Sequence, residues 1–153
     1  MHSASSGKAS QGSGSDPVYS ASVVISSDPA EARRVQDEIE GFLRAHHYAE
    51  RDIFGIKLSL EEALVNAIRH GNGMDRAKKV QIGYRIQADR CEIHITDEGT
   101  GFDPGDVPDC TAAENLERPC GRGLMLMRHY MSEVSFSNRG NSVCMVKLRN
   151  RSA

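Results

Sequence analysis

The stretch Ser59–Gly73 combines a strong helical pattern with polar residues that a packed helix normally excludes. Glu62, Asn66 and His70 recur every four residues, so on a helix they follow one stripe. That stripe runs beside an apolar face, as expected where a helix borders a cleft rather than open water. Gly and Asn residues at positions 71–73 end the helix. The apolar face consists of Ile56, Leu60, Ala63, Leu64, Ala67 and Ile68.

A carboxylate one helical turn before a carboxamide is a chemically useful pair. The Glu62 carboxylate can take a proton from a hydroxyl nucleophile. The Asn66 amide oxygen is a hard, neutral ligand suited to Mg²⁺, which usually arrives with substrate phosphates. The alternative interpretation is a solvated helix flank in which both side chains are simply exposed, and a single short motif does not separate the two.

The composition is that of one ordinary globular domain, and it limits the possible partners. The chain has 153 residues, of which 39% are hydrophobic and 26% are charged, with no Trp. A formal net charge of -2 argues against direct binding of nucleic acid, because contacts to phosphate backbones normally require a basic surface. No apolar run approaches the roughly 18 residues that span a bilayer, and the amino terminus lacks the apolar core of a signal peptide. We therefore expect a cytoplasmic protein without a membrane partner.

The four cysteines, Cys91, Cys110, Cys120 and Cys144, stand far apart and form no Cys-x-x-Cys pair. This spacing predicts neither a zinc knuckle nor a redox pair. In a cytoplasmic protein we expect them to be reduced thiols.

The first part of the chain predicts a tail, a strand and a helix. Residues 1–17 are rich in Ser and Gly and almost free of large apolar side chains, which predicts a disordered tail before a domain over residues 18–150. Alternating apolar residues predict a strand over Tyr19–Ile25. An Asp-Pro step at 28–29 predicts the start of a helix that runs to about His47. The central helix follows and begins near residue 51 or 52.

Two hairpins are expected in the remainder of the domain. Strict alternation over Lys78–Gln87, a turn at Asp89 and a second alternating run over Cys91–Ile95 predict an antiparallel pair. A last hairpin begins at Val134 and Phe136 and turns at residues 138–141. On its return strand we expect the core face to be Cys144, Val146 and Leu148 rather than Val143, Met145 and Lys147.

Two glycine pairs flank a long segment without periodicity. Asp97-x-Gly-x-Gly101 follows a strand, where an Asp can accept a hydrogen bond from an exocyclic amine and glycines allow a ligand to approach the backbone. Residues 103–120 carry several prolines and no regular pattern, which is typical of a functional or disordered loop. Gly121-x-Gly123 then opens a helix to Tyr130, whose free N–H groups are a natural seat for phosphate.

The order of these motifs resembles the N, G1 and G2 boxes of the nucleotide-binding fold shared by gyrase, the Hsp90 chaperones, histidine kinases and MutL. The resemblance rests on Glu62–Gly71, Asp97–Pro104 and Glu117–Leu124 and covers residues 18–149. Within this superfamily the chain is most similar to the small anti-sigma-factor serine kinases of bacterial partner-switching systems. The resemblance implies an α+β fold, the two-layer Bergerat sandwich, with a mixed, mostly antiparallel sheet, helices on one face and ATP bound under a lid.

The resemblance also assigns roles to individual residues. It makes Glu62 the general base, Asn66 the Mg²⁺ ligand and Asp97 the residue that recognises the adenine amino group. Gly99 and Gly101 would shape the adenine pocket, and Arg118 in the lid matches an arginine that contacts the partner near the terminal phosphate. Gly121 and Gly123 would cradle the phosphates, and the expected contacts to ATP also include His70, Arg122 and Leu124.

The carboxylate of Glu62 helps to choose among the members of the superfamily. Histidine kinases commonly have a neutral residue there, because an imidazole nucleophile needs no strong base, whereas a serine hydroxyl or water does. Two hypotheses remain. The first is an anti-sigma factor that sequesters a sigma factor and phosphorylates a STAS-type anti-sigma-factor antagonist on serine, as a homodimer. The second is a partner-switching module that binds ATP without kinase activity, which would have no use for Glu62.

Overall fold

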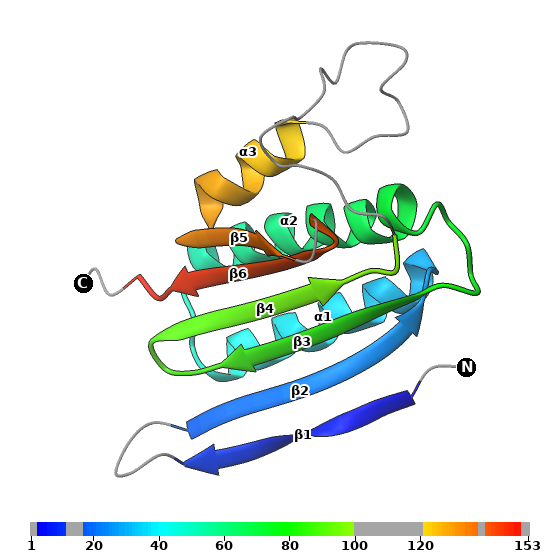
Figure 1. Cartoon of the computed structure of the whole chain (residues 1–153). Helices are drawn as coiled ribbons and strands as arrows, with labels where there is room; N and C mark the ends of the chain where they lie inside the picture. The colour runs from blue at the N-terminus through cyan, green and yellow to red at the C-terminus, as the bar shows by residue number, and fades with distance from the viewer. Residues whose placement is uncertain (1–2, 12–16, 100–120, 138–139, 151–153) are drawn as a thin grey trace.

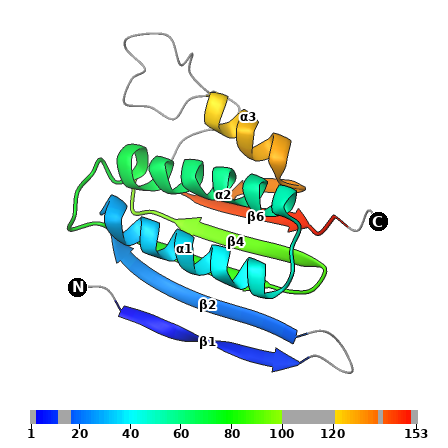
Figure 2. The same cartoon turned by 180° about the vertical axis from the view of Figure 1, so that it is seen from behind.

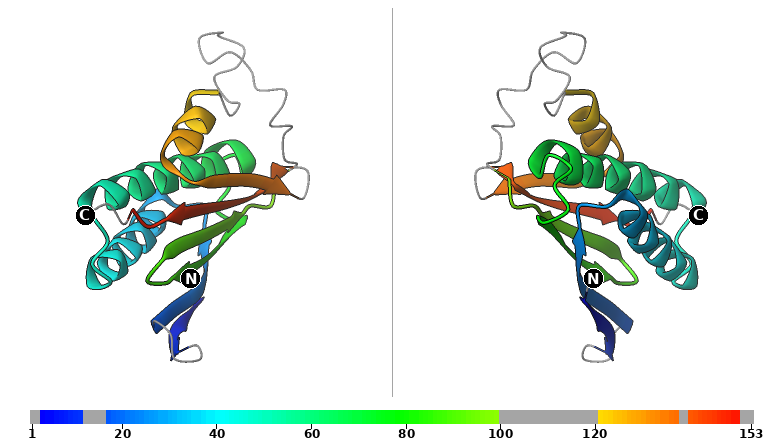
Figure 3. Two further views of the ribbon diagram at one scale, coloured as in Figure 1. Left: turned by 90° about the vertical axis from the view of Figure 1, so that its left-hand side faces the viewer. Right: turned by 90° about the vertical axis from the view of Figure 1, so that its right-hand side faces the viewer.

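The structure is a computed structural model that describes residues 3–11, 17–99, 121–137 and 140–150. A six-stranded sheet forms one layer, and the helices lie on one face of it (Figures 1 and 2). Seen along the sheet, the opposite face carries no helix among the described residues (Figure 3). This is the two-layer α+β arrangement that the resemblance implies.

The strand order in the sheet is β1-β2-β3-β4-β6-β5, and every described pair of strands is antiparallel. No parallel pair of the expected mixed sheet therefore occurs among these strands. Both predicted hairpins, β3–β4 and β5–β6, are present. The strands are β1 (Ser3–Gln11), β2 (Pro17–Ser26), β3 (Lys79–Ile86), β4 (Arg90–Thr96), β5 (Glu133–Ser137) and β6 (Ser142–Leu148).

Strand β1 differs from the predicted disordered tail. Ser3–Gln11 pairs with β2 at the edge of the sheet, with an irregularity between Ser5 and Lys8. An edge strand offers a row of unpaired backbone N–H and C=O groups, and pairing with that row needs no apolar side chains. The prediction of a disordered tail was wrong for residues 3–11, because it considered only the apolar side chains that the segment could bury and not its backbone hydrogen bonds.

Helix α1 (Pro29–Ala45) begins where the Asp-Pro step predicts. The Asp28 side chain accepts a hydrogen bond from the Ala30 N–H at 2.9 Å, which satisfies one of the free donors of the first turn. Helix α2 (Glu50–Val65) continues directly into a π-helical turn, η1 (Asn66–Gly71), and α3 (Gly121–Tyr130) packs against α2. None of the helices among the described residues is long and apolar enough to cross a membrane.

The core lies between the sheet and the helices. Alternate residues of β3 and β4 point into it, and α1 and α2 contribute side chains at helical spacing. Burying one such side chain contributes about 1.5–3 kcal/mol. The largest fully buried side chains are Ile25, Ile39, Leu43, Ile53, Ile56, Leu60, Ile82, Ile86, Ile93, Ile95, Met127 and Met145.

The core face of β6 differs from the predicted one, although Val146 of the predicted face is also buried. Val143 and Met145 belong to the core, whereas Leu148 is 55% exposed. Met145 pairs with Ile93 of β4, and neighbouring strands in register place paired residues on the same face. The prediction compared the hydrophobicity of the two faces of one strand and missed the long Lys147 side chain, which can lie along the core face and donate to the Tyr130 carbonyl at 2.8 Å.

Candidate functional site

The predicted helix of the Ser59–Gly73 stretch changes its winding at Asn66. From Asn66 to Gly71 the backbone is π-helical, and the Asn72 N–H donates to the Ala67 carbonyl at 2.8 Å. A π-turn holds more residues than an α-turn, so it rotates His70 away from the position that an ideal α-helix would give it. The stripe of Glu62 and Asn66 is retained, but its extension to His70 does not follow the predicted spacing.

The end of η1 packs directly on the end of β4. A Cβ atom added at Gly71 would lie 2.6 Å from Asp97 Oδ1, and one added at Gly99 would be 2.8 Å from the Gly71 Cα and would overlap the Gly71 carbonyl. Contacts of this kind are available only to glycine. The two motifs that carry Gly71 and Asp97 are therefore in backbone contact, at the end of β4 that lies beside η1 (Figure 1).

Asn72 fixes the junction between η1 and the end of β4. From the sequence it was predicted only as a residue that ends the helix. Its side chain is 2% exposed and makes three hydrogen bonds. Asn72 Nδ2 donates to Ser27 Oγ at 2.9 Å and to the Lys79 carbonyl at 3.0 Å, and Asn72 Oδ1 accepts from the Glu98 N–H at 2.8 Å. One side chain thus joins the end of η1 to the start of α1, the start of β3 and the turn after β4.

Asp97 is held by hydrogen bonds to Asn141 and Gly99. Its backbone N–H donates to the Asn141 carbonyl at 2.9 Å, and Asn141 Nδ2 donates back to the Asp97 carbonyl at 3.0 Å. Asp97 Oδ1 accepts from the Gly99 N–H at 2.7 Å. Burial raises the pKa of the Asp97 carboxyl above its ordinary value, while the Gly99 hydrogen bond and the Lys78 charge oppose that rise. Oδ2 lies against Gly71, and among the described residues no hydrogen bond reaches it.

A second group of predicted residues meets where α3 faces α2. A Cβ atom added at Gly123 would lie 2.8 Å from Glu62 Oε2 and 4.0 Å from Asn66 Nδ2. The first four N–H groups of an α-helix have no acceptor within the helix, and in α3 they belong to residues 121–124. These donors and the positive end of the helix dipole therefore lie next to the Glu62 carboxylate and the Asn66 amide.

The other predicted site residues divide into four groups. His70 is half-buried at the end of η1. The Leu124 side chain is 5% exposed and belongs to the core, so only its backbone could face a ligand. Gly101 and Arg118 lie outside the described residues, as do Cys110 and Cys120, while Gly121 and Arg122 are described only as part of helix α3.

Comparison with known proteins decides which family the fold represents. Residues 25–147 match the family described as the histidine kinase-like ATPase domain. The serine-protein kinase RsbW of Bacillus licheniformis is 31% identical over 122 residues, which cover 74% of this chain and 75% of RsbW. The chain belongs to the histidine kinase-like ATPase family, in its RsbW-like group.

Two further relatives carry related names. The anti-sigma F factor of Oceanobacillus iheyensis is 36% identical over 103 residues, or 63% of this chain and 70% of that protein. The serine/threonine-protein kinase BtrW of Bordetella bronchiseptica is 31% identical over 88 residues, or 56% of this chain and 62% of that protein. The family resemblance seen in the sequence motifs is confirmed by these matches.

The residues of this histidine kinase-like ATPase domain fit a nucleotide with Mg²⁺. Asp97 offers an acceptor in a partly buried position, which suits the amino group of a purine. Asn66 offers a neutral amide beside the start of α3, where phosphates would be stabilised by free N–H groups. The Asp97 carboxylate would accept a hydrogen bond from the base of the nucleotide, and the amino terminus of α3 would bind its phosphates.

Proposed function

We propose that this chain is an ATP-dependent protein-serine kinase and anti-sigma factor that binds a sigma factor and phosphorylates a STAS-type antagonist on serine. One observation supports the kinase over a module that uses ATP only as a ligand. The Glu62 carboxylate lies against Gly123 at the start of α3, where the terminal phosphate would be seated. A binding module has no need for a base at that position.

The proposed chemistry uses few protein groups. Asp97 accepts a hydrogen bond from the adenine amine, and Asn66 holds Mg²⁺, which supplies charge neutralisation for the phosphates. Glu62 accepts the proton of the substrate serine hydroxyl while the serine oxygen forms its bond to the terminal phosphorus and the bond to ADP breaks. Gly101, Arg118, Gly121 and Arg122 retain their proposed roles around the adenine, the partner and the phosphates.

The experiment that tests this proposal measures phosphoserine directly. The chain is incubated with Mg·ATP and candidate STAS-domain proteins, and the products are analysed by mass spectrometry. Glu62→Gln keeps the shape of the side chain and removes the base, so phosphorylation should fall by about 10²–10⁴-fold while ATP affinity barely changes. Glu61→Gln is the matched control, because Glu61 is the exposed neighbour of Glu62 on the same helix.

The outcome separates the two hypotheses. Undiminished phosphorylation by Glu62→Gln with intact ATP binding would exclude the general-base role. Tight Mg·ATP binding by the wild type, with partner exchange but no phosphoserine on any STAS-domain protein, would favour the binding module. Sigma-factor binding is measured separately by titration of candidate sigma factors, with and without antagonist.

We further propose that the protein acts in the cytoplasm as a homodimer. The anti-sigma function requires a compartment that contains RNA polymerase subunits. Sedimentation equilibrium with and without Mg·ATP tests the dimer, and a monomer at all concentrations would contradict it.

A further inference from the structure

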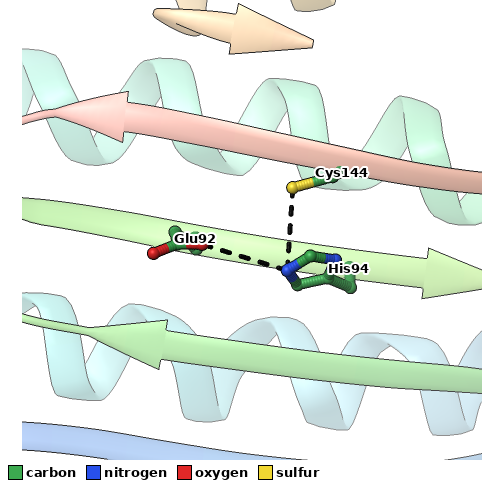
Figure 4. A group of neighbouring side chains, drawn as sticks. All are labelled: Glu92, His94 and Cys144. Atoms are coloured by element: carbon green, nitrogen blue, oxygen red, sulfur yellow. Dashed lines mark hydrogen bonds and ion pairs between the residues drawn. The ribbon is translucent and has the colours of Figure 1, made fainter. Parts of the chain in front are cut away.

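The helix-free face of the sheet carries three metal-binding side chains in one place. Glu92 and His94 lie two residues apart on β4, so both point to the same face, and Cys144 of β6 is the register partner of His94. Figure 4 shows the three side chains converging on the side of the sheet away from the helices. Each offers one ligand atom, and the three atoms lie within 4.8 Å of one another.

The distances can be compared with those of a tetrahedral zinc site. Zinc binds sulfur at about 2.3 Å and imidazole nitrogen at about 2.0–2.1 Å, so a tetrahedral angle separates the two ligand atoms by about 3.6 Å. Cys144 Sγ and His94 Nε2 are 3.6 Å apart. A nitrogen and a carboxylate oxygen on the same ion would be about 3.4 Å apart, and His94 Nε2 and Glu92 Oε1 are 4.0 Å apart. A small rotation of the Glu92 side chain closes that difference.

The Glu92 carboxylate is already oriented for this role. Arg90 contacts Glu92 Oε2 at 3.2 Å, which leaves Oε1 directed toward His94. Arg90 is itself fixed by a hydrogen bond of 3.2 Å from Nε to Gln87 Oε1. Hydrogen-bonded partners that orient a ligand in this way are a regular part of metal sites.

The surrounding charges favour a cation over a free thiolate. The carboxylates of Glu92 and Glu133 place negative charge around the Cys144 thiol. A bound divalent cation would neutralise these charges and displace the thiol proton, which passes to the buffer. The Arg90 guanidinium offsets part of the negative charge. Access is open, because the His94 side chain is 56% exposed.

We propose that Glu92, His94 and Cys144 bind one Zn²⁺ ion, with water as the fourth ligand. The ion would join β4 to β6 on the face of the sheet opposite the helices. This inference does not depend on the proposed kinase activity, because none of the three residues belongs to the Glu62 or Asp97 groups. The sequence did not indicate the site, because its ligands are brought together by pairing between strands that lie about fifty residues apart.

The full chain, freed of metal, is titrated with ZnCl₂ by calorimetry and separately with Co²⁺. We expect one equivalent of Zn²⁺ per chain and, with Co²⁺, a thiolate charge-transfer band. Cys144→Ser and His94→Ala should each weaken Zn²⁺ binding at least about tenfold, and Glu92→Gln should weaken it by a similar factor. The cobalt band should disappear in Cys144→Ser.

The controls locate the site on the chain. The double variant Cys110→Ser/Cys120→Ser removes the two thiols outside the described residues, and His129→Ala removes an exposed histidine of α3. Both should bind Zn²⁺ like the wild type. Circular dichroism confirms that each variant is folded. Absence of stoichiometric binding to the wild type, binding that survives in Cys144→Ser and His94→Ala, or binding that is lost in the Cys110→Ser/Cys120→Ser variant would overturn the proposal.

Discussion

Replacing Asn72 by alanine should destabilise the fold and weaken ATP binding together. The Asn72 side chain is 2% exposed and makes three hydrogen bonds, to Ser27, Lys79 and Glu98. Alanine removes all three and creates no new partner. The Glu98 N–H and the Lys79 carbonyl then lose the partner that holds the turn after β4 beside η1.

The size of the effect follows from the count of bonds. Each hydrogen bond contributes about 0.5–1.5 kcal/mol net, so the loss of three should cost about 3 kcal/mol in the free energy of unfolding. For a chain of this size, a loss of about 3 kcal/mol lowers the melting temperature by roughly 6–12 °C. Glu98 adjoins Asp97, so ATP affinity should fall even at temperatures where the variant is fully folded.

Urea denaturation followed by circular dichroism gives the free energy of unfolding, and calorimetric titration with Mg·ATP at low temperature gives the affinity. Gln81→Ala is the control, because it removes an exposed side-chain amide from β3 and should change stability by no more than about 0.5 kcal/mol. A loss below about 1 kcal/mol for Asn72→Ala would refute the idea that this side chain holds the junction.

Three other substitutions test the candidate site. Gly123→Ala should displace the Glu62 carboxylate and lower the rate of serine phosphorylation at least about tenfold. The variant should gain up to about 1 kcal/mol in stability, because alanine favours a helix. An unchanged rate would contradict the inferred contact between residue 123 and the Glu62 carboxylate. Asp97→Asn removes a partly buried carboxylate whose pKa is raised in the folded state, so the wild type should lose stability relative to the variant as pH rises above about 4. Melting temperatures across pH test this sign, and ATP affinity should fall in the same variant. Asn66→Ala should abolish Mg²⁺-dependent ATP binding without unfolding the chain; normal Mg·ATP binding would exclude Asn66 as the ligand.

The elements that were predicted correctly have local signals. The start of α1 follows from the Asp28 cap and Pro29, and β3 and β4 follow from strict alternation of apolar residues. These patterns depend only on neighbours in sequence. The same is true of the stripe of Glu62 and Asn66, which the structure places beside α3.

The features that were missed depend on partners distant in sequence. Apart from Val146, which is buried, the core face of β6 was predicted wrongly, because its register with β4, and not its own hydrophobicity, decides which side chains are buried. Strand β1 was missed because its pairing uses backbone groups. The hydrogen bonds of Asn72 reach Ser27, 45 residues away, and no periodic pattern in one segment can indicate them.

A helical wheel could not predict the π-helical turn either, because the wheel assumes one constant rotation angle per residue. The turn ends at a long-range contact, where Gly71 lies against Asp97 and Gly99. Wider turns of this kind recur at functional sites, where they re-aim side chains and backbone groups. Here the turn brings the last residues of the helix onto the end of β4.

The contacts at Gly99 and Gly123 differ in what an added side chain would move. At Gly99 an added Cβ meets the backbone of Gly71, so a side chain there must push η1 away from β4. At Gly123 the added Cβ meets only the end of the flexible Glu62 side chain, which can turn aside while the backbone stays in place. The position of Asp97 relative to α2 is therefore set by a rigid backbone contact, whereas the position of the Glu62 carboxylate is set by the space that α3 leaves for it. Any movement of the amino terminus of α3 would therefore act on Glu62, the proposed base, without disturbing Asp97, the proposed adenine-binding residue.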